Sequence, residues 1–177
     1  MVDASAAMSV ASPTREEVFA ILEAVRDPEV PVLSVVELGV VRDVALAPGE
    51  TIVTITPTYS GCPALRVMER EVVEALERAG LPNPRVVVSY TPAWTTDWIG
   101  PDAREKLRAY GIAPPGPRRH DDAPDVLVQL LRAPDVVACP YCGSRDTELR
   151  SEFGPTACKS IRFCRGCSQP FEQFKAI

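Results

Sequence analysis

Four cysteines near the end of the chain restrict its fold more than any other feature of this 177-residue sequence. They form two matched pairs, Cys139-x-x-Cys142 and Cys164-x-x-Cys167, with 21 residues between the pairs. Two such pairs on tight turns, brought together by short strands, form the ligand set of a zinc ribbon. We therefore expect residues 136–177 to fold as a zinc-ribbon-like module in which four thiolates bind one metal site.

The spacing of these cysteines leaves the identity of the metal open. Zinc is the first expectation, and iron or an iron–sulfur cluster is the alternative, because four thiolates suit each of them. A segment of about 40 residues is too small to be stable on its apolar core alone. Metal binding then supplies folding free energy on the order of 10 kcal/mol or more. Cys158 is a fifth cysteine nearby, and it is either a buried apolar side chain or an additional ligand or exchange site.

Composition argues against several classes of protein. The net charge of −5, with no cluster of basic residues, argues against a nucleic-acid partner. No apolar run reaches the roughly 18 residues of a membrane span, and the start of the chain lacks the basic, apolar pattern of a secretory signal. We expect a cytoplasmic protein with reduced cysteines. The single histidine, His120, lies in a proline-rich stretch, which argues against histidine-dependent hydrolytic and di-iron sites.

The first two thirds of the chain predict an α+β fold in which helices pack on a small mixed sheet. The hydrophobic periodicity predicts helices at residues 13–26, 63–80 and 102–110, and strands at residues 40–46, 51–56 and 85–90. The first two strands are expected to form a hairpin. Thr14 is the expected cap of the first helix, and Gly80 is the expected end of the second.

The expected organisation has four parts. Residues 1–13 form a disordered tail, and residues 14–111 form the α+β domain. Residues 112–135 are a proline-rich linker that contains a short amphipathic helix at residues 125–132. Residues 136–177 form the cysteine module.

Cys62 stands apart from the other cysteines, between the second predicted strand and the second predicted helix. If it caps that helix, its sulfur meets free N–H groups and the positive end of the helix dipole, which lowers a thiol pKa. Three carboxylates of the preceding segment, Asp27, Glu29 and Glu37, are able to approach it. Such a thiol is a transient metal or cluster site, a nucleophile, or simply a packed cysteine at a helix start.

Two tryptophans lie close together in the segment between the third strand and the third helix. Trp94 and Trp98 flank a short polar stretch. They pack either in the core or in a lid, or they form a patch that binds a partner.

Several segments of the chain together resemble a known family. Residues 27–31 (DPEVP), 37–39 (ELG) and 56–63 (TPTYSGCP) resemble the metal–sulfur cluster assembly family that includes bacterial SufT. The paired cysteines, together with residues 94–98 (WTTDW) and 110–115 (YGIAPP), are similar to one branch of it, the PaaD subunits of the phenylacetyl-CoA ring 1,2-epoxidase system. The resemblance covers residues from about 14 to the C-terminus.

The resemblance implies a non-catalytic accessory or maturation subunit in aerobic phenylacetate degradation. Its implied task is to assist iron or iron–sulfur cluster assembly on the oxygenase or on its iron–sulfur reductase. It implies Cys62 as the transfer residue and Asp27 as a supporting acid, and Glu37 stands where relatives often carry Asp. The alternative is a structural or electron-transfer metal-binding subunit of the oxygenase complex. Expected partners are the other epoxidase subunits and the reductase, and a homodimer stays open.

Overall fold

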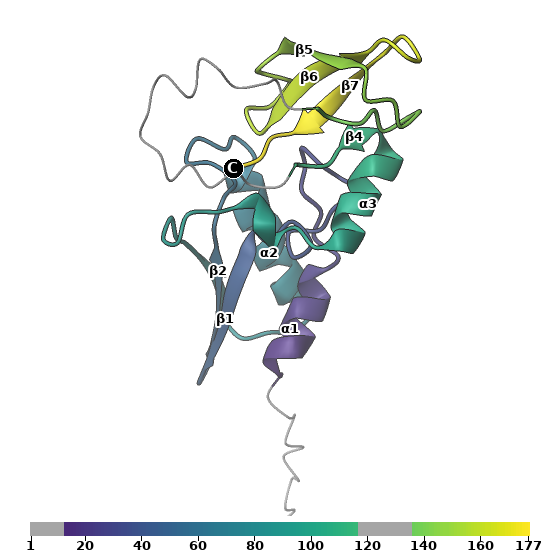
Figure 1. Ribbon diagram of the computed structural model, residues 1–177. Coiled ribbons are helices and arrows are strands. Elements are labelled where there is room, and N and C mark those ends of the chain that lie inside the picture. The colour runs from purple at the N-terminus through teal and green to yellow at the C-terminus, as the bar shows by residue number, and fades with distance from the viewer. Residues whose placement is uncertain (1–12, 117–135) are drawn as a thin grey trace, which may run out of the picture.

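The computed structural model describes residues 13–116 and 136–177 (Figure 1). Residues 1–12 of the expected tail at residues 1–13, the expected helix at residues 125–132 and His120 lie outside these ranges. Within them, no helix combines the length and the apolar character needed to span a membrane. The described residues form an α+β fold with two sheets, as the sequence predicts for its class.

The first sheet has the strand order β1-β2-β3. β1 (Val41–Ala47) and β2 (Glu50–Ile55) form the predicted antiparallel hairpin. β3 (Pro84–Val88) pairs in parallel with β2, and a parallel pair needs a crossover connection. The helix α2 (Leu65–Arg78) supplies that crossover, so the turn before α2 lies at the end of the central strand.

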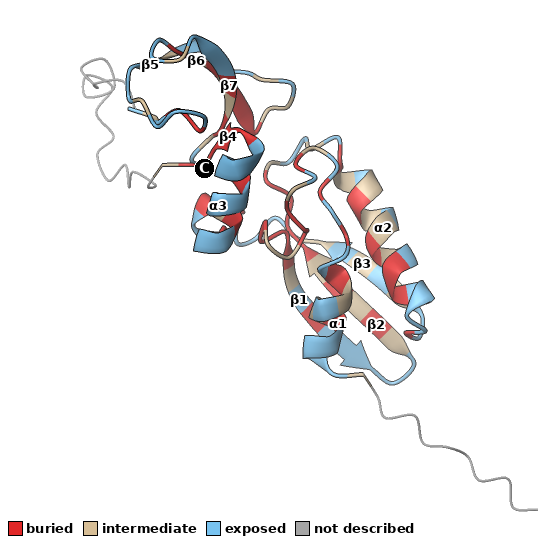
Figure 2. Cartoon of the chain, turned by 90° about the vertical axis from the view of Figure 1, so that its right-hand side faces the viewer, coloured by how far each residue is buried: buried red, intermediate tan, exposed pale blue. Residues whose placement is uncertain are grey.

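Two helices cover one face of this sheet (Figure 2). α1 (Arg15–Leu22) starts at the predicted cap, Thr14, whose hydroxyl accepts the N–H of Glu17 while the Glu17 carboxylate accepts the N–H of Thr14. The second helix starts later than predicted, because its cap is Ala64. Gly80, with a φ of +77°, follows the end of α2 as predicted, since a left-handed residue commonly terminates a helix.

The second sheet joins the C-terminal strands to a strand from the first part of the chain. Its order is β4-β7-β6-β5, with β5 (Thr147–Ser151), β6 (Lys159–Cys164) and β7 (Gln169–Phe174) antiparallel. β4 (Ile112–Ala113) directly follows α3 (Pro101–Tyr110) and pairs in parallel with β7. This second sheet, called the ribbon sheet below, therefore takes one strand from the start of residues 112–135, the segment expected to be a linker.

The two sheets also share buried side chains. The ring centroids of Trp94 and Phe174 lie 5.9 Å apart, and the indole N–H of Trp94 donates to the carbonyl oxygen of Leu38 at 3.1 Å. The N–H of Thr96 donates to the carbonyl oxygen of Ile177 at 3.2 Å. Trp94 is therefore a core residue, and it joins the C-terminal strands to the α+β part in one hydrophobic core.

Replacing Phe174 by alanine should lower the free energy of unfolding by about 3–5 kcal/mol, because the ring is fully buried in the shared core. Chemical denaturation of the full chain measures this change. The matched control is Phe153→Ala, since that ring is 69% exposed and its removal should cost only about 0.5 kcal/mol. Equal effects of the two substitutions would contradict a core shared by both sheets.

Candidate metal and thiol sites

The four paired cysteines meet at one end of the ribbon sheet. The sulfur atoms of Cys139 and Cys167 lie 3.7 Å apart, and those of Cys142 and Cys164 lie 3.6 Å apart. All four sulfurs lie within 4.8 Å of one another. Sulfurs held tetrahedrally about 2.3 Å from a central ion are roughly 3.8 Å apart. The set therefore has the spacing that one tetrahedral ion requires.

Local backbone geometry explains why the first pair forms a tight loop. The N–H of Gly143 donates to the carbonyl oxygen of Cys139 at 2.9 Å, and the N–H of Cys139 donates to that of Ser144 at 2.9 Å. Gly143 has a φ of +74°, which favours glycine. At Gly166, a Cβ atom would lie 2.8 Å from the Ser144 hydroxyl oxygen, so the two loops approach closely only because this residue has no side chain.

The spacing of the four sulfurs bears on the choice of metal. Zinc and a single iron both fit a tetrahedron of thiolates. A multi-iron cluster requires more widely separated sulfurs, because iron and sulfide ions occupy the space between them. The geometry therefore favours a single ion over the cluster that the sequence left open, and zinc stays the first expectation.

Replacing Cys139 by serine should remove the metal from the purified chain, because three thiolates and a hydroxyl hold zinc far more weakly than four thiolates. The metal content measured by elemental analysis should fall from one ion per chain to nearly none. The segment 136–177 should become sensitive to protease. Cys158→Ser is the matched control and should keep its metal. A metal-free yet protease-resistant segment in the Cys139 variant would contradict the structural role of the ion.

Cys158 is not part of this four-sulfur group. It directly precedes β6, whereas Cys164 ends β6, and six residues of strand span about 20 Å. The Cys158 sulfur lies 3.1 Å from the hydroxyl oxygen of Thr156 and 3.8 Å from a carboxylate oxygen of Glu29. The fifth cysteine thus faces the α+β part of the chain, away from the four-sulfur group.

The loop that carries Glu29 is held by Asp27. One carboxylate oxygen of Asp27 accepts the N–H groups of Glu29 and Val30, both at 2.8 Å. Burial raises the pKa of Asp27, and these two backbone hydrogen bonds oppose the rise. The Asp27 carboxylate therefore stabilises the conformation of this loop through two backbone hydrogen bonds. Burial raises the pKa of Glu29, and the negative charge of Asp27 raises it further.

Cys62 lies half-buried in the turn before α2, and it is not the cap of that helix. Burial raises the pKa of the Cys62 thiol to about 11, although the N–H of Ala64 donates to the sulfur and opposes the rise. The nearby charges of Glu29 and Asp27 raise it further, and so does Cys158. The sequence expectation of a lowered pKa is wrong, because burial raises the pKa most, the charges of Glu29 and Asp27 raise it further, and the cap of α2 is Ala64 and not Cys62.

The structure brings some of the expected site residues together and leaves one apart. After burial, the charges of Glu29 and Asp27 raise the pKa of the Cys62 thiol. The Glu37 carboxylate is instead paired with Lys106 and Arg26, and it accepts the N–H of Ser34 at 3.0 Å. Its partners lower the pKa of Glu37, although partial burial opposes them. In this structure Glu37 fastens the loop to α3.

Sequence reasoning did not connect Cys158 with Cys62. The two residues are far apart in the chain, and neither lies in a motif that contains the other. Only the docking of the ribbon onto the α+β part brings Cys158 to Glu29 and into the electrostatic surroundings of Cys62.

The reaction of Cys62 with iodoacetamide should be slow at pH 8 and should keep accelerating up to a pH of about 11, because the thiolate is the reactive form. A pKa two units above the ordinary 9.0 lowers the thiolate fraction about a hundredfold, and higher nucleophilicity recovers about tenfold of that. Mass spectrometry of the alkylated peptide should therefore show a rate about tenfold below that of an ordinary cysteine.

The matched variant for this measurement is Glu29→Gln. Removing this charge should lower the pKa of Cys62 and raise its alkylation rate at pH 8. A rate that already levels off by pH 8 in the unaltered chain would contradict the raised pKa.

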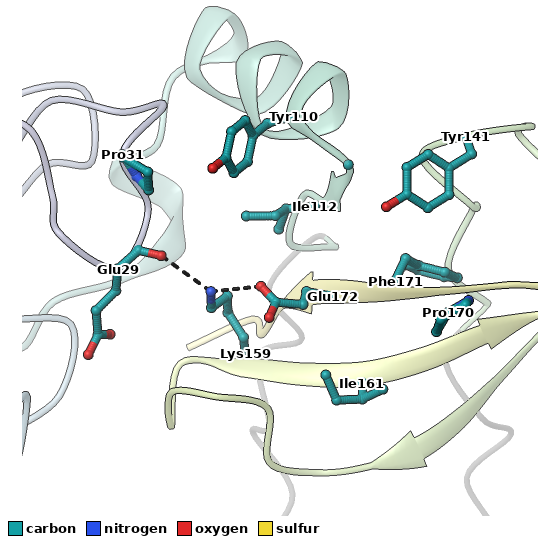
Figure 3. A pocket seen from close by; sticks show the side chains of 11 residues that line it. Glu29, Pro31, Tyr110, Ile112, Tyr141, Lys159, Ile161, Pro170, Phe171 and Glu172 are labelled. Carbon is teal, nitrogen blue, oxygen red and sulfur yellow. Dashed lines mark hydrogen bonds and ion pairs between the residues drawn. The ribbon is translucent and has the colours of Figure 1, made fainter.

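A pocket of about 440 Å³ opens beside this site, between α3 and the ribbon strands (Figure 3). Lys159 lies in it almost fully buried, and its amino group pairs with the Glu172 carboxylate at 2.7 Å and donates to the backbone oxygen of Glu29 at 3.3 Å. Figure 3 shows that Glu29 turns this backbone oxygen towards Lys159 and its carboxylate away from the pocket. The ribbon therefore fixes the position of Glu29 through Lys159.

Comparisons with known proteins give two family matches, one to the part of the chain with the first sheet and one to the part with the C-terminal strands. Residues 15–89 match the family model described as iron-sulfur cluster assembly protein, and residues 123–175 match the model described as PaaD zinc beta ribbon domain. The chain is 44% identical over 170 residues to an Escherichia coli (strain K12) protein that is named as a subunit of 1,2-phenylacetyl-CoA epoxidase. That alignment covers 96% of this chain and 97% of the relative.

Shorter relatives match only the α+β part. The Fe-S protein maturation auxiliary factor YitW of Bacillus subtilis (strain 168) is 39% identical over 87 residues, which are 47% of this chain and 82% of that protein. The crystal structure of a DUF59 domain of unknown function from Bacillus anthracis is 29% identical, with a TM-score of 0.50. It covers 52% of this chain and 90% of that domain, so the α+β part has the fold of that domain.

Proposed function

This chain belongs to the PaaD family, and we therefore propose that it is a non-catalytic accessory subunit that assists iron–sulfur assembly. Its clients in this proposal are the oxygenase or the iron–sulfur reductase of a phenylacetyl-CoA ring 1,2-epoxidase system. The name of the relative that matches along its whole length supports the epoxidase system. The names of the relatives that match only the α+β part support the maturation role.

The observation that carries this proposal is the position of the Cys62 thiol. It is half-buried in the turn before α2, packs against the core cluster that also contains Cys158, and lies within the field of the Glu29 and Asp27 charges. A neutral thiol with a high pKa is a poor nucleophile, so its surroundings do not suit covalent catalysis. A sulfur beside two carboxylates does suit a cation that is held and passed on.

The ribbon has a different role in this proposal. Cys139, Cys142, Cys164 and Cys167 hold a zinc ion that keeps the C-terminal strands folded. In the folded ribbon, the amino group of Lys159 donates to the backbone oxygen of Glu29 and so keeps the ribbon packed against the loop that carries Glu29. Zinc is redox-silent, so in this role it does not carry electrons.

The second candidate function is electron transfer within the oxygenase complex. It is favoured by the same four sulfurs, because their spacing also suits a single iron. Anaerobic purification with metal analysis and an absorption spectrum separates the two. Stoichiometric zinc without visible bands supports the accessory role, whereas iron with reversible redox bands supports electron transfer.

Replacing Cys62 by alanine should abolish phenylacetate-dependent growth in a strain that relies on this chain for its epoxidase. The variant should still fold and keep its ribbon metal, since Cys62 is no part of that set. The iron content of the oxygenase and the reductase, each purified from the mutant strain, should fall in the protein that receives the iron.

The matched control is Ser60→Ala, which alters an exposed residue of the same loop and should support normal growth. Normal growth with Cys62→Ala, with both client proteins fully loaded, would contradict the transfer role.

A further inference from the structure

Cys158 is the one cysteine of the ribbon that the four-sulfur site leaves unused. It is only 3% exposed, and it belongs to the hydrophobic cluster against which Cys62 also packs. A purely apolar role would not need a carboxylate beside it, yet Glu29 lies 3.8 Å from its sulfur. The Cys158 thiol therefore makes polar contacts, with the Glu29 carboxylate and the Thr156 hydroxyl, in addition to its packing.

We propose that Cys158, Cys62 and Glu29 form a second metal site, which holds a ferrous ion at the junction of the ribbon and the α+β part. This inference rests on the proposed function and deepens it, because it makes the ribbon a donor of one ligand to the transfer site. Two sulfurs and one carboxylate are a ligand set that iron accepts, with water completing the coordination.

Contacts of Cys158 and of the residue after it fix the ribbon side of this site and join it to Glu29. The N–H of Lys175 on the end of the ribbon donates to the carbonyl oxygen of Cys158 at 2.9 Å. The amino group of Lys159, the next residue, reaches the backbone oxygen of Glu29 at 3.3 Å. The positive charge of Lys159 is balanced by Glu172, which lies 2.7 Å away on the neighbouring strand. The lysine therefore positions Glu29 without leaving an uncompensated charge that would repel a cation.

The charges around the two sulfurs favour a divalent cation. Burial raises the pKa of Cys158, and the charges of Glu29 and Asp27 raise it further, while Thr156 and the charge of Lys159 oppose the rise. Glu29 and Asp27 act on Cys62 in the same sense. Nearby carboxylates disfavour deprotonation of a thiol, because two negative charges repel each other. A bound cation removes this penalty, because it neutralises the negative charge that each thiol gains on losing its proton. Binding of one ferrous ion to both thiols forms two iron–sulfur bonds and releases two protons, with no change in oxidation state.

The donors of this second site are more widely spaced than those of the ribbon. Among the residues that the structure describes, only the four ribbon cysteines have all their donor atoms within 4.8 Å of one another. The proposed site therefore requires the side chains of Cys62 and Glu29 to rotate towards Cys158 when an ion binds, and Cys62 lies in a turn while Glu29 is only partly buried. A set that must close around its ion binds it less tightly than a set already gathered, which suits cargo that is released.

The test is an anaerobic titration of the zinc-loaded full chain with Co²⁺, which reports sulfur ligands through thiolate-to-metal absorption. The unaltered chain should bind one cobalt ion while the ribbon zinc is retained by elemental analysis. Cys158→Ser and Cys62→Ser should each halve the absorption per cobalt and weaken binding at least tenfold. Glu29→Gln should weaken binding with the absorption per cobalt unchanged.

Two controls secure the interpretation. Glu152→Gln removes an exposed acidic residue of the same ribbon edge and should leave the titration unchanged. Cys158→Ala should repeat the result of Cys158→Ser, with retained zinc and circular dichroism showing that each variant is folded.

The outcomes separate this inference from the proposed function. Cobalt binding by the Cys158 variants with unaltered absorption and affinity overturns the composite site, and so does the absence of any second cobalt ion. If the Cys158 variants bind normally while Cys62→Ala still abolishes growth on phenylacetate, the transfer role stands and only the contribution of the ribbon fails. If Cys62→Ala supports growth, the transfer role itself fails.

Discussion

The burial of the inner edge of the ribbon against the α+β core is the contact on which the rest of the structure depends. Phe174 packs on Trp94, and Cys158 enters the same cluster one strand away. A ribbon that did not pack on this core would contribute only its four-cysteine site. Docked, it brings a thiol and a buried lysine to the loop of Glu29, which is where the Cys62 turn also lies.

The surroundings of Cys62 raise its pKa, whereas the start of a helix usually lowers the pKa of a cysteine thiol. A thiol at a helix cap is made acidic and reactive by the helix dipole. Cys62 precedes the cap of α2, and burial together with the charges of Glu29 and Asp27 raises its pKa, so its proton is retained at neutral pH. In the site that we propose, the same negative charges that slow its reaction with electrophiles also favour a bound cation, so slow alkylation and metal capture share one physical cause.

Local sequence patterns predicted the elements whose geometry is local. The paired cysteines, the β1–β2 hairpin and the Thr14 cap each depend on residues close together in the chain, and the structure contains all three. The start of α2 was misplaced because Pro63 and Ala64 are both acceptable at a helix start, and spacing alone does not choose between them. β4 was missed because two residues carry no periodicity, and only pairing with β7 makes them a strand.

The composite site was beyond the reach of sequence patterns for a similar reason. Glu29 and Cys158 are separated by most of the chain, and their contact depends on how the ribbon docks. Asp27 was expected as a supporting acid, but nothing in its motif indicates that its carboxylate is already occupied by two backbone N–H groups. Glu37 likewise follows the same loop in sequence, and only the packing of α3 assigns its carboxylate to Lys106.

The two sets of sulfur ligands differ in a way that matches two different tasks. In the ribbon, four sulfurs are already gathered at tetrahedral spacing, so an ion that enters gains all its ligands with little movement of the chain. At the junction, two sulfurs come from separate parts of the fold, and a relative shift of those parts would separate them. An ion bound there is coupled to the docking of the ribbon. A partner that loosened that docking would therefore also release the ion, so the contact that builds the site is also the one through which it can be emptied.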